Sequence, residues 1–93
     1  MIIDPTRQPF KDNYKLMIGS ILPRPIAFVS TKSKDGIDNL APFSFFNGVC
    51  SNPPTISFCP VRKGADGEIK DTLKNIQDTG VFALNIVSES FAP

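Results

Sequence analysis

The segment from Phe43 to Asn47 combines three flat apolar rings with one hydroxyl and one amide. A planar heterocyclic ligand needs apolar surfaces to stack on and a few hydrogen-bonding groups to fix its edge. The alternative is core packing, because phenylalanines are common in buried strands. Phe45 and Phe46 are neighbours, however, so in a strand they point to opposite faces and do not serve the same core. We therefore predict that this segment contacts a ligand or a partner.

A second cluster, Lys70, Asp71 and Thr72, stands at the expected start of a helix. Free backbone N–H groups and the positive end of the helix dipole favour a bound phosphate there. Lys70 and Thr72 would add a charge and a hydroxyl. The simpler alternative is that Asp71 only caps the helix while Lys70 points into solvent. Taken alone, this cluster does not decide between an anion site and an ordinary helix start.

A third candidate is Arg24, which lies between Pro23 and Pro25. The fixed φ angles of the two prolines stiffen this loop, so the guanidinium would have a rigid mounting for a charged contact. An ordinary surface arginine in a stiff loop is the alternative. The acidic residues form no spaced pair that can be placed on one face, so paired-carboxylate hydrolysis is unsupported.

The composition removes several kinds of chemistry. The chain contains no histidine, which excludes Ser-His-Asp, Cys-His and histidine-metal catalysis. Cys50 and Cys59 lack CxxC spacing, so a zinc site is not expected. A disulfide between them is one possibility, and two buried, reduced thiols are the interpretation that we favour. Remaining chemistry must come from carboxylates, lysine or a bound cofactor.

The size and charge of the chain limit its organisation and partners. A chain of 93 residues is long enough for one domain with one core, which we take to span residues 1–93. A formal net charge of +1 gives no strong field that would draw the protein to nucleic acid or to an anionic membrane. No apolar run is long enough to cross a bilayer, and the start has no signal-peptide pattern. We therefore expect a cytoplasmic protein.

The pattern of apolar residues and turns predicts a mostly β fold with short helices. The turns are too short for repeated parallel crossovers, so the strands should form an antiparallel barrel or a piece of one. Arg62 to Gly67 is polar and glycine-rich, which is typical of a surface loop. We expect helices at Asn13 to Ile21 and at Asp71 to Thr79 and strands at Ile26 to Thr31, Asn39 to Phe46, Thr55 to Val61 and Val81 to Val87.

Three details of these elements can be checked. The first strand is apolar and β-branched enough to be buried on both faces. A turn at Lys34-Asp35-Gly36 should fold the chain back as a hairpin, because glycine can take a positive φ. The second helix should have Asp71 as its N-cap and Gly80 at its C-terminal end.

Three segments in sequence resemble the flavin-reductase-like FMN-binding split-barrel family, which includes the flavoredoxin-like proteins. They are Pro23 to Thr31, Asn39 to Asn47, and Lys70 to Thr72 followed by Asn75 and Ile76. The resemblance covers most of the chain, from Tyr14 to about Val87. It implies a Greek-key split barrel that forms a homodimer and binds FMN near the subunit interface.

The resemblance also implies where the flavin lies. The segment that begins at Ser44 would contact the ring, the ribityl chain or the phosphate, and the start of the second helix would hold the phosphate. Asp71 would order that turn, and the residues before and within the first strand would add further contacts. The implied cofactor residues are Arg24, Ser30, Thr31, Ser44, Phe45, Phe46, Asn47, Lys70, Asp71 and Thr72.

The implied activity is that of an NAD(P)H-dependent flavin reductase or a related oxidoreductase. Hydride from the reduced nicotinamide would pass to the flavin, so no protein acid or base is needed. FAD could replace FMN, and no motif distinguishes NADH from NADPH. A non-catalytic FMN electron carrier and a ligand-free interaction module are two further hypotheses that the sequence leaves open.

The chain departs from this family in length. Members are usually longer, and their later segment supplies further strands, part of the dimer surface and some flavin contacts. We therefore expect a single flavin-reductase-like domain whose barrel is incomplete and lacks its C-terminal part. Such a barrel exposes strand edges and apolar surface unless a second chain covers them.

Overall fold

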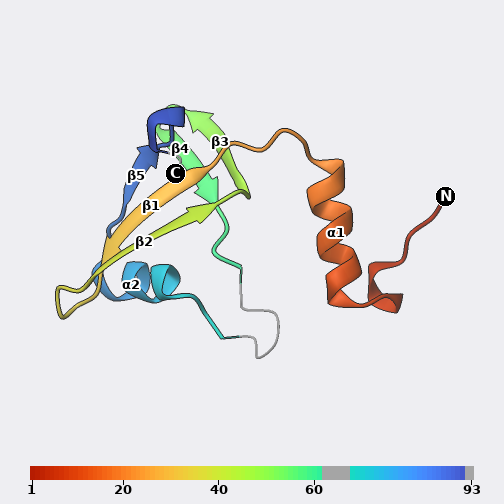
Figure 1. The fold of residues 1–93 in the computed structure, drawn as a ribbon, viewed down its shortest axis with the longest axis horizontal. Helices are drawn as coiled ribbons and strands as arrows, with labels where there is room; N and C mark the ends of the chain where they lie inside the picture. Colours follow the sequence, from red (N-terminus) through yellow and green to blue (C-terminus); the bar gives the residue numbers. More distant parts are fainter. Residues whose placement is uncertain (62–67, 92–93) are drawn as a thin grey trace.

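The structure is a computed structural model that describes residues 1–61 and 68–91. The predicted loop from Arg62 to Gly67 lies outside the described residues. Strands predominate over two α-helices and two short 3-10 helices (Figure 1). In chain order the elements are η1 Pro5–Arg7, α1 Phe10–Ser20, β1 Ala27–Lys32, β2 Asp38–Phe43, β3 Phe46–Ser51, β4 Pro54–Phe58, α2 Asp71–Thr79, β5 Ala83–Ile86 and η2 Glu89–Phe91.

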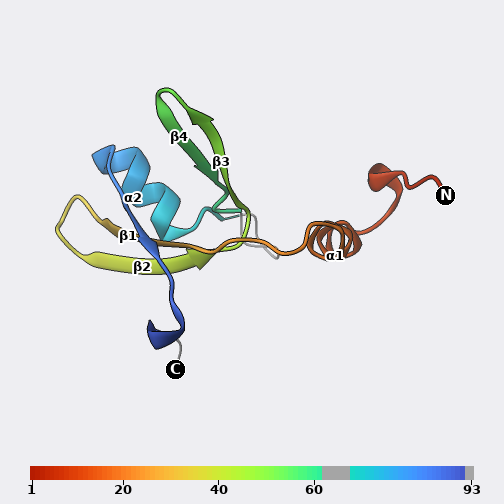
Figure 2. The same cartoon turned by 90° about the horizontal axis from the view of Figure 1, so that it is seen from above.

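The strands form two small antiparallel sheets. One sheet has the order β2-β1-β5, and the other is the hairpin of β3 and β4. The described strands do not close into a barrel, and Figure 2 shows the hairpin rising away from the larger sheet, with α2 on the same side. The predicted fold class, a mostly β structure with short helices and an incomplete barrel, is confirmed.

The larger sheet has one buried face. Ala27, Val29 and Thr31 alternate along β1 and are buried, whereas Phe28 and Ser30 between them are only half-buried. The expectation that this strand is buried on both faces was therefore wrong. Successive side chains of a strand point to opposite faces, and among the described residues no layer of structure seals the second face.

The core on the buried face is small. Its apolar centre is Ala27, Val29 and Phe43, and side chains from all five strands line or border it. The partly buried apolar residues packed against it are Ala41, Phe46, Phe58 and Leu84. The hairpin of β3 and β4 thus reaches the larger sheet through phenylalanine rings, and Phe43 and Phe58 lie 5.5 Å apart between ring centroids.

The strand predicted from Asn39 to Phe46 is two strands. β2 pairs with β1 as far as Phe43, and β3 begins at Phe46 and pairs instead with β4. The chain changes partners between them, and the carbonyl of Phe45 accepts a hydrogen bond of 3.0 Å from the amide of Cys59. The strand predicted from Thr55 to Val61 ends earlier, at Phe58, as β4.

The second helix agrees with its predicted bounds. α2 runs from Asp71 to Thr79, and Gly80 closes it with a φ of 74°, the left-handed conformation that glycine adopts without strain. The predicted N-cap was wrong by one residue. Lys70 is the extended cap, because its carbonyl accepts the first helical hydrogen bond, from Lys74, and Asp71 is already helical. The predicted turn before β2 is confirmed, since Gly36 has a φ of 85°.

The first helix begins earlier than predicted and stands apart. α1 starts after Pro9, whose carbonyl accepts hydrogen bonds from the amides of Asp12 and Asn13, and it ends at Ser20. None of its residues is buried. Figures 1 and 2 both show α1 beside the sheets and joined to β1 by an extended linker.

Candidate functional site

The aromatic segment lies at the corner where the chain passes from β2 to β3. Ser44 and Phe45 form the bend, and Phe46 and Asn47 begin β3. Phe46 packs against the core, whereas the ring of Phe45 meets Tyr14 of α1 edge-on at 6.3 Å between centroids. The two neighbouring phenylalanines therefore serve different surroundings, as predicted. Ser44 and Phe45 are half-buried and Asn47 is exposed.

Arg24 connects this corner to α1. Its Nη1 donates hydrogen bonds to the carbonyl oxygens of Ile18 at 2.7 Å and Ile21 at 3.0 Å, at the C-terminal end of α1. The guanidinium carbon lies 5.7 Å from the ring centroid of Phe45, a cation–π distance. The buried Nε has no hydrogen-bond partner among the described residues. Arg24 is therefore held in place and is not an ordinary surface arginine.

The hydroxyls of Ser30 and Thr31 point to opposite faces of β1. Thr31 is buried, and its Oγ1 accepts a hydrogen bond of 3.0 Å from Nδ2 of Asn75 on α2. Ser30 is half-buried on the other face, where Nδ2 of Asn85 lies 3.4 Å from its Oγ. The two residues therefore do not present both hydroxyls to one ligand on the same face of the sheet.

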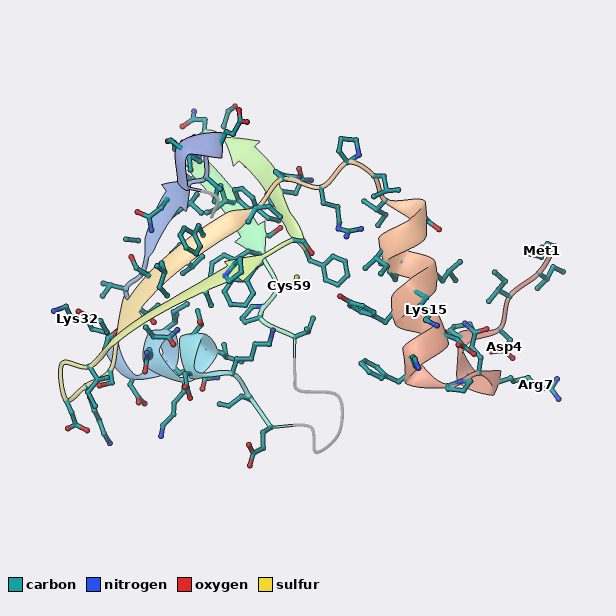
Figure 3. The ribbon with its side chains drawn as sticks, viewed as in Figure 1. Met1, Asp4, Arg7, Lys15, Lys32 and Cys59 are labelled. Carbon is teal, nitrogen blue, oxygen red and sulfur yellow. The ribbon has the colours of Figure 1, made fainter. Side chains whose placement is uncertain are left out.

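A groove of about 680 Å³ lies at the end of this sheet. Its rim includes an exposed ion pair in which Lys32 Nζ lies 3.3 Å from Asp38 Oδ1. Figure 3 shows Lys32 at the end of β1 farthest from α1. The groove is lined by Ser30, Thr31, Lys32, Asp38, Asn39, Leu40, Val81, Phe82 and Ala83.

The start of α2 carries the predicted anion cluster. Thr72 is 1% exposed, and its Oγ1 accepts a hydrogen bond of 2.9 Å from Nδ2 of Asn39 on β2. Nζ of Lys70 lies 5.4 Å from the ring centroid of Phe43. Asp71 is exposed. Lys70 stands at the N-cap position, where its ammonium can only donate hydrogen bonds, so its side chain does not cap the N–H groups of the first turn.

The structure brings some candidates together and keeps others apart. The contact between Lys70 and Phe43 joins the start of α2 to the strand that leads directly into Ser44. Ser30 lies on the opposite face of the sheet from Thr31. Sequence reasoning gave no role to Asn39 and Asn75, although both stand in the family-like segments. The signal that could have identified them is that both are asparagines inside regular elements, where a buried side-chain amide needs a hydrogen-bond partner.

The cysteines are more exposed than predicted. Cys50 and Cys59 are free thiols, and both are exposed, because among the described residues nothing covers the outer surface of the hairpin near them. Figure 3 shows Cys59 just after β4. Within residues 1–61 and 68–91, no group of three or more histidine, cysteine, aspartate or glutamate side chains is arranged to hold a metal ion.

Two further findings concern charge and membranes. Hydrogen bonds from the hydroxyl and the amide of Thr6 hold the pKa of the Asp4 carboxyl below its usual value. Asp4 lies in the N-terminal segment, away from the candidate site (Figure 3). Neither helix in the described part of the chain is long and apolar enough to span a membrane.

Two of the solved structures that the chain matches show its similarity to known proteins. The nitrilotriacetate monooxygenase component B of Bacillus cereus has a TM-score of 0.89 and 49% identity, over 98% of this chain and 45% of that one. The 2-nitrobenzoate 2-nitroreductase of Pseudomonas fluorescens has a TM-score of 0.80 and 34% identity, over 97% of this chain and 42% of that one. Both alignments include nearly the whole chain.

Sequence relatives agree with these neighbours. An uncharacterized protein of Halalkalibacterium halodurans is 49% identical over 89 residues, which are 96% of this chain and 42% of that protein. An uncharacterized protein of Aquifex aeolicus is 54% identical over 76 residues, 82% of this chain and 38% of that protein. The chain thus spans less than half the length of the relatives that it matches.

A family model described as "Flavin reductase like domain" matches residues 18–92. The match includes the corner from Ser44 to Asn47 and the start of α2, and the expected resemblance is confirmed. The chain belongs to the flavin reductase like domain family.

Proposed function

We propose that this chain binds FMN and acts in NAD(P)H-dependent flavin reduction. The observation that carries the proposal is the family match over residues 18–92, which includes both parts of the candidate site. The flavin ring, ribityl chain or phosphate is contacted by Ser44, Phe45, Phe46 and Asn47. Lys70, Asp71 and Thr72 lie at the phosphate, and Arg24 supplies a further contact. Ser30 and Thr31 face opposite sides of β1, so at most one of the two contacts the flavin.

The chemistry of the two regions fits the two ends of FMN. At the corner, Phe45 is half-buried between Tyr14 and Arg24 and offers an aromatic surface beside a cation. At the start of α2, first-turn N–H groups and the ammonium of Lys70 favour a dianionic phosphate. Thr72 is 1% exposed and its Oγ1 accepts a hydrogen bond from Asn39, so we assign it mainly to holding the first turn of α2 in place.

The bound flavin would supply hydride acceptance and donation, which amino-acid side chains do not provide. The chain's own part is to bind and orient. Phe45 and Phe46 exclude water on the two sides of the corner, and Arg24 keeps Phe45 and the end of α1 in one arrangement. Lys70 neutralises phosphate charge. No histidine is needed, because no proton has to be carried by a side chain in this scheme.

We propose that the chain also forms a homodimer. A compact monomer of this mass would expose about 5,300 Å², and this chain exposes 7306 Å². The excess, about 2,000 Å², is more than the roughly 800 Å² that one partner buries in a standard stable interface. The outlying α1 and the short length of the chain relative to its relatives contribute part of it. Exposed apolar side chains such as Leu40, Val49 and Val81 are part of this surface. Cytoplasmic location stays a prediction.

The central experiment is titration of the purified chain with FMN, followed by visible absorption and by the mass in solution. We expect a bound flavin spectrum and a dimer mass. A colourless protein that takes up no FMN would contradict the proposal and favour a ligand-free interaction module. FAD titrated in parallel measures cofactor preference.

Anaerobic mixing of the flavin complex with NADH or NADPH tests the reductase activity. We expect the flavin absorption to bleach with at least one of them. Rapid reduction by a protein donor, without bleaching by either nucleotide, would show an electron carrier instead.

A further inference from the structure

The contact between α2 and the larger sheet is polar. The buried residues of α2 are Thr72 and Asn75, at 1% and 6% exposure, and the residue opposite Asn75 on β1 is Thr31, also at 6%. A helix usually packs on a sheet through apolar side chains, because burying polar groups costs free energy unless they are paired. The contact of α2 with the sheet therefore depends on paired polar groups and not on apolar burial.

Two side-chain hydrogen bonds satisfy the buried groups. Nδ2 of Asn39 on β2 donates to Oγ1 of Thr72 at 2.9 Å, and Nδ2 of Asn75 donates to Oγ1 of Thr31 on β1 at 3.0 Å. The helix is thus attached to two neighbouring strands at two points, which lie about one turn apart along α2. Directional bonds at two points fix both the distance of a helix from the sheet and its rotation about its own axis, which apolar contacts restrain less sharply.

The first of these bonds acts on the first turn of α2. The first helical hydrogen bond runs from the amide of Lys74 to the carbonyl of Lys70, at 3.1 Å. The amides of Asp71, Thr72 and Leu73 precede it and have no acceptor within the helix. Thr72 is 1% exposed, which leaves the amides of Asp71 and Leu73 for an anion. Because the Thr72 side chain is held from the sheet side by Asn39, the direction of these amides is set relative to β2.

We propose that Asn39 and Asn75 are positioning residues for the phosphate end of the flavin. They orient the first turn of α2 through Thr72 and Thr31 and do not contact the cofactor. This inference rests on the proposed function. It makes the side-chain amides of Asn39 and Asn75 responsible for part of the preference for FMN over a flavin without a phosphate. Their removal should weaken the binding of FMN and leave the binding of riboflavin, which has the same ring system without the phosphate.

The test is a pair of dissociation constants, for FMN and for riboflavin, measured by quenching of flavin fluorescence. The variants are Asn39→Leu and Asn75→Leu. The matched control is Asn13→Leu, since Nδ2 of Asn13 donates a hydrogen bond of 3.0 Å to the carbonyl of Pro5, far from α2. We expect each of the first two variants to lose about tenfold in preference for FMN over riboflavin. The control should keep the preference of the unmodified chain.

Several outcomes overturn the inference. One is an equal loss of affinity for both flavins, which shows that the asparagines only hold the fold. Another is an unchanged preference in both variants. Where circular dichroism shows that a leucine variant does not fold, Asn39→Ser and Asn75→Ser replace it, with the same expected loss of preference. If the unmodified chain binds neither flavin, the proposed function is contradicted together with this inference. If the unmodified chain prefers FMN and the asparagine variants keep that preference, only this inference is contradicted.

Discussion

The two helices of this chain are held in opposite ways. α2 lies on the sheet through buried, paired polar groups from β1 and β2. α1 has no buried residue and meets the body through Arg24 and through the edge of Tyr14 on Phe45. Segments with few buried contacts open at low free-energy cost, whereas buried segments open only with the rest of the fold. The phosphate end of the proposed site is therefore expected to be rigid, and the aromatic end to be adjustable.

The largest expected effect comes from the core beneath α2. Phe43 is 4% exposed, and Phe43→Ala removes a core ring and the contact of Lys70 with it. We expect a loss of about 3–5 kcal/mol in the free energy of unfolding, measured by urea denaturation. Phe10→Ala on α1, where the ring is 63% exposed, is the control and should change it by less than about 0.5 kcal/mol. Equal effects would mean that α1 is packed as tightly as the core of the sheet.

Two glycines provide a comparison with opposite signs. Gly80 has a φ of 74°, and an added Cβ meets no atom within 4 Å, so Gly80→Ala is disfavoured by backbone strain alone. We expect α2 and the fold to lose about 1–2 kcal/mol. Gly19 lies inside α1, also with open space around it, and Gly19→Ala should instead favour the helix by up to about 1 kcal/mol. Thermal unfolding followed by circular dichroism measures both, and the same sign for both changes would contradict this account.

Arg24→Met should loosen α1 alone. The substitution removes the hydrogen bonds to the carbonyls of Ile18 and Ile21 and keeps a side chain of similar length. We expect amide hydrogen exchange in α1 to speed up by an amount that corresponds to about 1 kcal/mol. Exchange in α2 should stay unchanged. Faster exchange in both helices would show that the two regions are coupled.

The smallest effect concerns pH and the segment before α1. The pKa of Asp4 is lowered by hydrogen bonds from Thr6, so its ionised form favours the ordered segment. This contribution is present above the ordinary pKa of an aspartate and is lost as pH falls through the lowered pKa. NMR shifts of the Thr6 amide should report the titration, and Asp4→Asn should abolish it. A Thr6 amide that titrates in the Asp4→Asn variant would rule out this assignment.

The parts of the fold that local signals determine were predictable from the sequence. The bounds of α2 follow from its apolar spacing and from Gly80, whose left-handed conformation is a property of that residue. The turn at Gly36 is local in the same sense. The family-like segments also point to both parts of the candidate site, because their residue types and order along the chain carry the resemblance.

The parts that depend on distant partners were not predictable in this way. The end of β2 at Phe43 depends on β3 leaving to pair with β4. The exposure of Cys50 and Cys59 depends on what lies over the hairpin. The role of Arg24 depends on where the last carbonyls of α1 lie, and the roles of Asn39 and Asn75 depend on which helix faces which strand.

The strand order β2-β1-β5 has a consequence for how the chain assembles in time. β1 with β2 and β3 with β4 are neighbours along the chain, so each pair closes only a short loop. β5 must return to β1 across most of the chain, which carries a larger loop-closure entropy. We expect the two hairpins to form first and β5 to dock last. During synthesis, the edge of β1 that pairs with β5 therefore stays unpaired until the ribosome has released the residues after α2.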